Sequence, residues 1–399
     1  MKFETKRKPS AAFWVLSVAF LSFFALGLPD GALAVAFIGM QQELGLLVAH
    51  AGFIVAANSI LYSLTSACLG RLNRRLKLES INLLGTALLG LGFLSFGLAQ
   101  NLWLLVMSAA FCGTGAGMID ASLNAYMARS FSARHINFLH CFWGAGATFS
   151  PFLMSQMVLL LGWRAGYFAL VGMMGLVSAI ILTSVRSGVW ERAASAPAKT
   201  AQAATAATHY LDKPWHKAAQ ALVCFFYGGV EYSLVFFTAI VLDARGVPLG
   251  TIALYPMAYY FCIAAGRVAF GGLSKWLRGI TVIRVGLAFG FAGIIILLFT
   301  GNIAGMALAG FGLAPVFPSL LHGTAKRFAP KALAKLVGYQ IAALGAGSAV
   351  LVFGMSQLLG WVSMDALYPV SMALLLLVFG LNEALERALR RASPTCMFS

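Results

Sequence analysis

Charged residues are scarce in this sequence. Only 10% of its 399 residues are Asp, Glu, Lys or Arg, whereas 60% are hydrophobic. Because a soluble domain of this size carries about 25% charged residues, polar side chains cannot cover the surface here. Apolar runs long enough to cross a hydrocarbon core of about 30 Å as helices recur along the whole chain. The composition predicts a protein that crosses a membrane many times.

Sequence motifs of enzymes and metal sites are also lacking. There is no Gly-x4-Gly-Lys-Ser/Thr loop for ATP hydrolysis, and neither His-Glu-x-x-His nor Gly-x-Ser-x-Gly occurs. Five of the 6 cysteines lie in apolar runs and none forms a Cys-x-x-Cys pair, so we interpret them as small packing residues. We therefore predict that the protein is not an enzyme and holds no cofactor and no metal.

Positive charge, in contrast, is abundant, with a formal net charge of +16. Basic groups precede the first apolar run and follow every second one, whereas the alternate connections hold only Arg164 and Arg245. This alternation follows the positive-inside rule, so it argues against a nucleic-acid partner. We expect a multi-pass protein of the cell inner membrane with both termini in the cytoplasm. The first run is too long for a signal peptide and lacks a small-residue cleavage site.

The apolar runs predict an all-α membrane protein with twelve transmembrane helices in two pseudo-symmetric six-helix bundles. The predicted spans are 11–37, 49–69, 80–98, 102–127, 135–161, 165–185, 215–242, 249–272, 280–299, 302–324, 334–360 and 366–386. The low-complexity segment ASAPAKTAQAATAAT separates the sixth span from the seventh. The predicted domains are an N-terminal bundle (1–185), a cytoplasmic linker (186–214) and a C-terminal bundle (215–399).

The two halves repeat at an offset of about 200 residues. GRLNRRL (Gly70–Leu76) ends the second span and GGLSKWL (Gly271–Leu277) ends the eighth. GTGAGM (Gly113–Met118) corresponds in the same way to GFGLAP (Gly310–Pro315). Repeated bundles joined by a linker indicate a cavity between them, which opens to each side of the membrane in turn as one bundle rocks against the other.

This plan, with a basic Gly-x-Leu cluster after spans 2 and 8, resembles the major facilitator superfamily. Six stretches are similar to its fucose permease and sodium-dependent glucose transporter branch: PDG in span 1, DASLNAY in span 4, RHINFLHCFWGAGA in span 5, YGGVEYS in span 7, Gly266–Arg267 in span 8 and PVFPSL in span 10. One departure concerns gating. Where the superfamily has an acidic residue after the Gly-x-Leu run, this chain has Arg74 and Lys275, so the usual charge clasp between helix ends is absent or rebuilt. The candidate gating residues are Arg74, Arg75, Arg267 and Lys275.

Three acids lie well inside apolar spans, namely Asp30, Asp120 and Glu231. An ionised carboxylate at mid-membrane costs at least a few kcal/mol, and burial favours the neutral form. A carboxyl group that opens to either side in turn and is neutral when hidden can carry a proton, so we predict that all three couple transport to protons, with Na⁺ as the alternative ion. Pro29 and Gly31 predict a bend of the helix beside Asp30. The competing interpretation is that one acid forms a structural ion pair with Arg267.

The resemblance adds that Asp30 and Asp120 match the acids tied to proton coupling in the fucose permease. Around the acids, polar and aromatic side chains suit a hydrophilic ligand, and a tryptophan ring can stack on a sugar. Tyr255 and Tyr259 share a helix face, with Tyr260 turned away. Packing is the alternative for each tyrosine, and an interhelical hydrogen bond is the alternative for the histidine. The candidate substrate-binding residues are Asn58, Asn124, Asn137, His140, Trp143, Tyr255, Tyr259 and Gln340.

The sequence therefore predicts a secondary active transporter of alternating access, in which proton symport carries a small hydrophilic solute such as a monosaccharide. The alternative is a proton-driven exporter of drugs or metabolites. Exporters of this superfamily carry a glycine-rich Gly-Pro motif in helix 5, and GATFSPFLMS (Gly146–Ser155) keeps the proline but has few of the glycines. A non-transporting sensor is a third alternative, which the near-absence of chain outside the spans disfavours. The expected partners are a small-molecule substrate and the lipid bilayer, and we expect a monomer.

Overall fold

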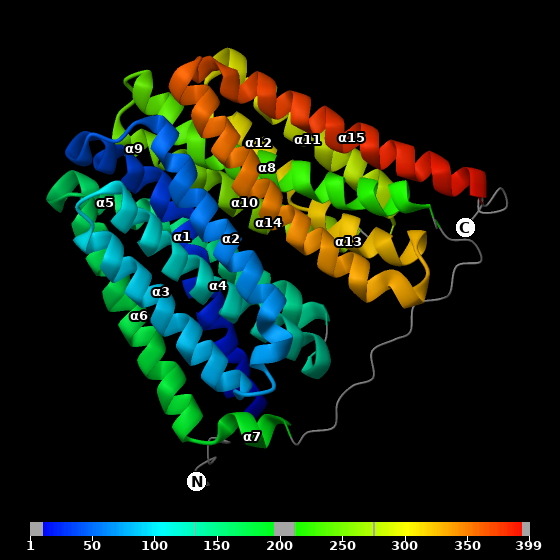
Figure 1. Cartoon of the computed structure of the whole chain (residues 1–399), viewed down its shortest axis with the longest axis horizontal. Helices are drawn as coiled ribbons and strands as arrows, with labels where there is room; N and C mark the ends of the chain where they lie inside the picture. The colour runs from blue at the N-terminus through cyan, green and yellow to red at the C-terminus, as the bar shows by residue number, and fades with distance from the viewer. Residues whose placement is uncertain (1–10, 132, 195–210, 212, 274–275, 393–399) are drawn as a thin grey trace, which may run out of the picture.

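The computed structural model describes residues 11–131, 133–194, 211, 213–273 and 276–392. Across these ranges the ordered elements are helices, and no strand occurs. Within them, 12 helices or helix pairs are long and apolar enough to cross a membrane. These match the twelve predicted spans, so the predicted all-α membrane fold is confirmed. Figure 1 shows the long helices packed side by side.

The first half contributes six long helices and one short one. They are α1 (Ala11–Leu44), α2 (Val48–Leu72), α3 (Leu78–Leu98), α4 (Leu102–Ser130), α5 (Ala133–Leu161), α6 (Trp163–Arg186) and the six-residue α7 (Val189–Ala194). Helix α7 lies inside the predicted linker, whose residues 195–210 and 212 are outside the described ranges. Helix α1 runs through Pro29 without interruption.

The second half contributes the remaining helices: α8 (Pro214–Ala244), α9 (Leu249–Ile252), α10 (Leu254–Leu273), α11 (Gly279–Thr300), α12 (Ile303–Leu313), α13 (Val316–Arg327), α14 (Pro330–Trp361), the 3₁₀ turn η1 (Met364–Ala366) and α15 (Leu367–Ala392). Two spans are each built from two helices, α9 with α10 and α12 with α13. The second pair is divided at Pro315, which has no backbone N–H to continue the helix.

Glycine contacts repeat between the halves at an offset of 201 residues, as the sequence repeat predicts. A Cβ atom added to Gly146 of α5 would collide with the backbone of Phe24 in α1, and one added to Gly347 of α14 would collide with that of Phe225 in α8. Turns repeat in the same way, since the first long helix of each half ends before a left-handed glycine, Gly45 at φ 64° and Gly246 at φ 74°. Positive φ has little steric cost for glycine.

The two halves meet along α2 with α14 and α5 with α10. We call the end that carries Arg71, Arg186 and Arg278 the basic end, and the opposite one the far end. At the far end, the amide of Gln357 in α14 donates to the carbonyl of Ala49 in α2 at 2.9 Å. Figure 1 shows α2 and α14 close together there and diverging towards the basic end. The molecule is therefore closed between its halves at the far end.

Candidate functional site

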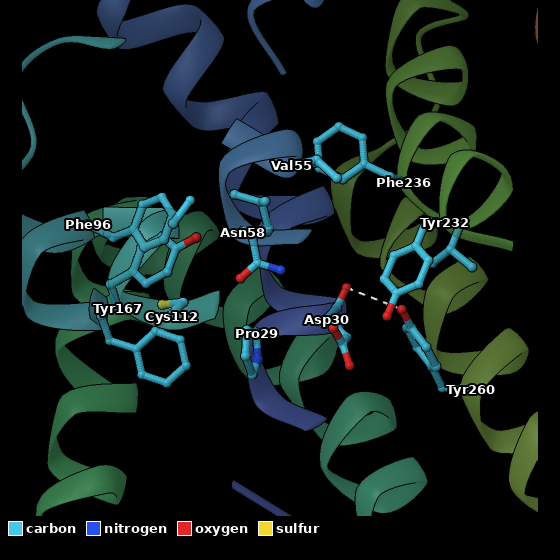
Figure 2. Close-up of a pocket in the computed structure, with 14 residues that line it drawn as sticks. Pro29, Asp30, Val55, Asn58, Phe96, Cys112, Tyr167, Tyr232, Phe236 and Tyr260 are labelled. Carbon is cyan, nitrogen blue, oxygen red and sulfur yellow. Dashed lines mark hydrogen bonds between the residues drawn. The ribbon is translucent and has the colours of Figure 1, made fainter. Parts of the chain in front are cut away.

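A cavity of about 50 Å³ lies where the two halves meet. Its polar lining includes Asp30 and Asn58 from the first half and Tyr232 and Tyr260 from the second. Figure 2 shows these side chains facing one another, with aromatic and aliphatic side chains on the remaining walls. Two of the predicted site residues, Asp30 and Asn58, therefore share one pocket with tyrosines of the other bundle.

Asp30 is held by two hydrogen bonds from different helices. The indole N–H of Trp143 in α5 donates to its carboxylate Oδ2 at 2.9 Å, and the hydroxyl of Tyr260 in α10 donates to its backbone carbonyl at 3.3 Å. The approach of α5 depends on glycine, because a Cβ atom on Gly31 would lie 2.6 Å from the ring of Pro151. Gly31 therefore serves close packing of α1 against α5, which brings Asp30 to the indole.

Asp120 of α4 is also held by two donors. The hydroxyl of Tyr62 in α2 donates to Oδ2 at 2.6 Å, and the amide of Asn124 donates to Oδ1 at 2.9 Å. The second bond was predictable, since residues four apart share a helix face. A Cβ atom on Gly117 would lie 2.6 Å from the carbonyl oxygen of Tyr62, so this glycine admits α2 to the site. Gly113 and Gly117 are four residues apart, and small residues at this spacing favour close contact between helices.

The acids are not clamped to basic partners. Within the described ranges, none of Asp30, Asp120 and Glu231 forms an ion pair, and neither does Arg267. The guanidinium carbon of Arg267 lies 4.9 Å from the centre of the Trp143 ring. Arg267 lies in the neighbourhood of Asp120 and Glu231 but forms an ion pair with neither. The structure therefore does not contain the predicted alternative, an acid paired with Arg267.

The tyrosines of α10 are arranged differently from the expectation that Tyr255 and Tyr259 contact the substrate, because Tyr260, which is turned away from their shared face, is the one that lines the pocket. Tyr260 lines the pocket, whereas the hydroxyl of Tyr255 donates to the carbonyl of Gly301 at 2.6 Å. Tyr259 is fully buried, and its hydroxyl has no hydrogen-bond partner among the described residues. The face of Tyr255 and Tyr259 packs inside its own half, because Gly310 of α12 lies against the backbone of Tyr259.

Two further candidate ligand residues, His140 and Gln340, are not brought to the pocket. The ring of His140 packs edge-on against Phe23 at 5.5 Å, which agrees with an interhelical role. Gln340 is buried and accepts a hydrogen bond from the hydroxyl of Thr324 at 2.9 Å. That contact belongs to a network inside the second half, so Gln340 does not face the other bundle. The backbone of Asn137 lies in α5, but its side chain is outside what the structure describes.

Among the gating candidates, Arg74 and Arg75 are exposed and form no ion pair with a described residue. Lys275 lies outside the described ranges. An exposed ion pair joins Lys77 to Glu191 at 2.6 Å and so connects the start of α3 to α7. The hydrogen bond and charge of Lys77 lower the pKa of Glu191 below its usual value.

Sequence reasoning missed Tyr62, Tyr232 and Tyr260. Tyr62 could have been found, because it lies four residues after Asn58 on the same helix face. Tyr232 follows Glu231 directly in the YGGVEYS stretch. Only the packing of α10 on α12 could show that Tyr260 reaches the pocket. No group of three or more His, Cys, Asp or Glu side chains in the described residues is arranged to hold a metal.

Twelve spans that enclose acids and polar groups between two halves define a membrane transporter. A family model described as the Major Facilitator Superfamily matches residues 16–352, and the chain belongs to that family. The match places the chain in a family of membrane transporters, which are not enzymes.

Individual similar proteins are more distant. An uncharacterised MFS-type transporter of Mycobacterium tuberculosis is 25% identical over 182 residues, which cover 44% of this chain and 31% of that protein. The matched region thus spans about a third of the relative's length. A crystal structure of a mutant of the peptide transporter POT matches with a TM-score of 0.73 and 12% identity, covering 94% of this chain and 95% of that one. At this identity the likeness shows the fold alone.

Proposed function

We propose that the protein is a proton-coupled symporter of a small hydrophilic solute such as a monosaccharide. One observation carries the proposal. Three acids from α1, α4 and α8 lie at membrane depth, near one another, with no ion pair to a described residue. A carboxyl group in such a place is stable when neutral, and its ionised form needs water or a donor. Gain and loss of a proton can therefore accompany movement of the bundles.

The contact between the halves supports alternating access. The far end is closed by α2 against α14, and the basic end corresponds by the positive-inside rule to the cytoplasm. In the proposed cycle this arrangement is the state from which solute leaves to the cytoplasm. Rocking of the two bundles would break the Ala49–Gln357 contact and open the site to the other side.

The donors around the acids favour H⁺ over Na⁺ as the coupling ion. Asp30 accepts from an indole N–H, and Asp120 accepts from a phenol and an amide. Each of these bonds occupies a lone pair that a sodium ion would need, and directs a positive hydrogen towards the site where the cation would sit. Protonation of one oxygen requires no such cage of oxygen ligands. This contrast supports the proton and leaves sodium as the alternative.

An exporter of apolar compounds remains the second candidate, because most of the pocket lining is apolar. Phe93, Phe96 and Phe236 are among the residues that line it. Aromatic walls accommodate drug-like compounds as well as the apolar face of a sugar. The direction of proton movement distinguishes the two functions.

The test uses the purified protein in vesicles with a pH-sensitive dye on the outside. A panel of sugars and related polyhydroxy compounds is added to the outside without an imposed gradient. For a symporter we expect the outside to become alkaline on addition of a transported solute, together with counterflow of labelled solute. External acidification on addition of the solute would instead favour the exporter. Absence of counterflow for every compound would overturn the proposal.

A further inference from the structure

Arg267 is a cation at membrane depth without a hydrogen-bonded partner in the described part of the chain. Its side chain is half-buried, its Nε is fully buried and unbonded, and its guanidinium forms no ion pair with a described residue. Its guanidinium carbon lies 4.9 Å from the centre of the Trp143 ring. A charged side chain inside a membrane is costly unless it is paired or serves a ligand.

Two arginines that join helices elsewhere in the chain, Arg327 and Arg284, do have hydrogen-bond acceptors. Arg327, which is 3% exposed, donates at 2.8 Å to Gln220 and at 2.8 Å to Asn382, and lies 3.8 Å from Glu386. Arg284 donates to both carboxylate oxygens of Glu383 at 2.8 and 2.7 Å. Where this protein uses a guanidinium for packing its helices, it supplies acceptors. Among the described residues, no hydrogen-bond acceptor contacts Arg267.

The nearby acids, Asp120 and Glu231, do not serve as hydrogen-bond acceptors for Arg267. Both oxygens of Asp120 already accept hydrogen bonds from other side chains, and Glu231 is not at ion-pair distance. The other ionisable side chains that the structure describes near Arg267 include no carboxylate: they are His140, Cys141, Tyr227, Tyr232 and Tyr259. If the acids are neutral when solute binds, as the proposed proton coupling requires, then the guanidinium is the charge that the solute meets.

We propose that Arg267 binds a carboxylate group of the transported solute, so that the substrate is a sugar acid or a related hydroxy acid. This inference rests on the proposed function, since it narrows the solute of the same site. The planar guanidinium matches a carboxylate through two parallel hydrogen bonds. The neighbouring Trp143 ring offers a stacking surface, and Asn58 and Tyr260 line the adjoining pocket with groups that suit hydroxyls. Because the site has a single arginine beside three acids, it suits a ligand with one negative charge, such as a carboxylate, better than a phosphate ester with two.

The test compares carboxylates with their neutral amides, which have nearly the same shape. The probes are D-glucuronate against D-glucuronamide and L-lactate against L-lactamide, with D-glucose as the neutral sugar. Binding to the purified full-length protein is measured by calorimetry. For at least one pair we expect the carboxylate to bind about tenfold to a hundredfold more tightly than the amide, as is usual for a hydrogen bond to a charged group.

Variants of Arg267 test whether its guanidinium causes the preference for the carboxylate over the amide. Arg267→Gln is expected to remove the difference between carboxylate and amide, and Arg267→Lys to keep part of it, because lysine keeps the charge without the fork. Arg245→Gln, at an exposed ion pair, is the matched control and should bind as the wild type does. If Arg267→Gln does not fold, the comparison of probes on the wild type and on Arg267→Lys still decides the question.

The two proposals fail in different ways. Binding of glucose or an amide as tight as that of the carboxylates, or no binding of any carboxylate, overturns the role of Arg267. Retention of the full preference in Arg267→Gln does so too. Carboxylate binding that depends on Arg267, without proton movement in vesicles, supports the anion site and overturns the proton-coupled symport instead.

Discussion

Closure of the far end depends on Gly52, and its replacement by valine should shift the protein towards the state that is open there. Gly52 of α2 faces α14, and a Cβ atom on it would collide with the Ser356 side chain and lie 3.0 Å from Cα of Phe353. That backbone cannot turn aside as a flexible side chain can. Overpacking of this kind costs about 1–3 kcal/mol. The contact is lost when the halves separate, so the cost applies to the closed far end alone.

A change of about 1–3 kcal/mol alters the ratio of two states by about 5-fold to 150-fold. The measurement is electron spin resonance on labels at Leu47 and Val362, which are exposed near the far ends of α2 and α14, in a background without native cysteines. We expect a longer inter-label distance to gain population in Gly52→Val. Solute uptake should slow, because one state of the cycle becomes rare.

The matched control is Gly354→Val, on α14 itself. No atom lies within 4 Å of a Cβ added at Gly354, so the same change of residue type should leave the distance distribution and uptake unaltered. If Gly52→Val gives the distance distribution of the wild type, then the contact between α2 and α14 does not set the balance between the states, and our account of far-end closure is wrong.

Three more predictions concern the acids and the second half. Asp30→Asn and Asp120→Asn should each abolish uphill uptake driven by a proton gradient, with counterflow retained in at least one; accumulation at the wild-type level in both would contradict proton coupling. Tyr62→Phe removes the 2.6 Å hydrogen bond to Asp120 and should slow proton-driven uptake about tenfold, the equivalent of about 1.4 kcal/mol, while the melting temperature changes little. Arg327→Ala leaves two buried amides and a glutamate without their partner and should cost about 3–5 kcal/mol of stability, measured by thermal unfolding. The exposed Arg74→Ala should change the stability by less than about 0.5 kcal/mol, and an equal loss in both arginine variants would show that the buried network is not what matters.

Part of the site was predictable because it lies within single helices. The bond between Asn124 and Asp120 follows from a spacing of four residues. The spacing of four residues between Gly113 and Gly117 likewise favours close contact with another helix, although it does not say which helix comes close. The structure identifies α2 as that helix, since both glycines lie against its backbone.

Contacts between helices could not be derived in this way. Trp143 and Asp30 are 113 residues apart, and Tyr260 and Asp30 are 230 apart. Whether a side chain meets another depends on the rotation of each helix about its axis, which packing against several neighbours decides. The choice of Tyr255 and Tyr259 instead of Tyr260 as pocket residues has this cause: the helical period showed that Tyr255 and Tyr259 share a face, but not which way the face points.

The sequence by itself determined the membrane fold, the twelve spans and the repeat. Hydropathy and span length are local properties of the chain, and the offset of 201 residues appears when the two halves of the sequence are compared. It also identified Asp30, Asp120 and Glu231 as candidate coupling residues, since an acidic residue within an apolar span can be recognised without any structure. Only the tertiary structure decided that, among the described residues, these acids have no basic partner and Arg267 lies over Trp143 without an acceptor, and that α2 closes on α14 at one end. Those facts depend on distances between segments that the chain brings together only by packing, and packing is a property of the whole fold.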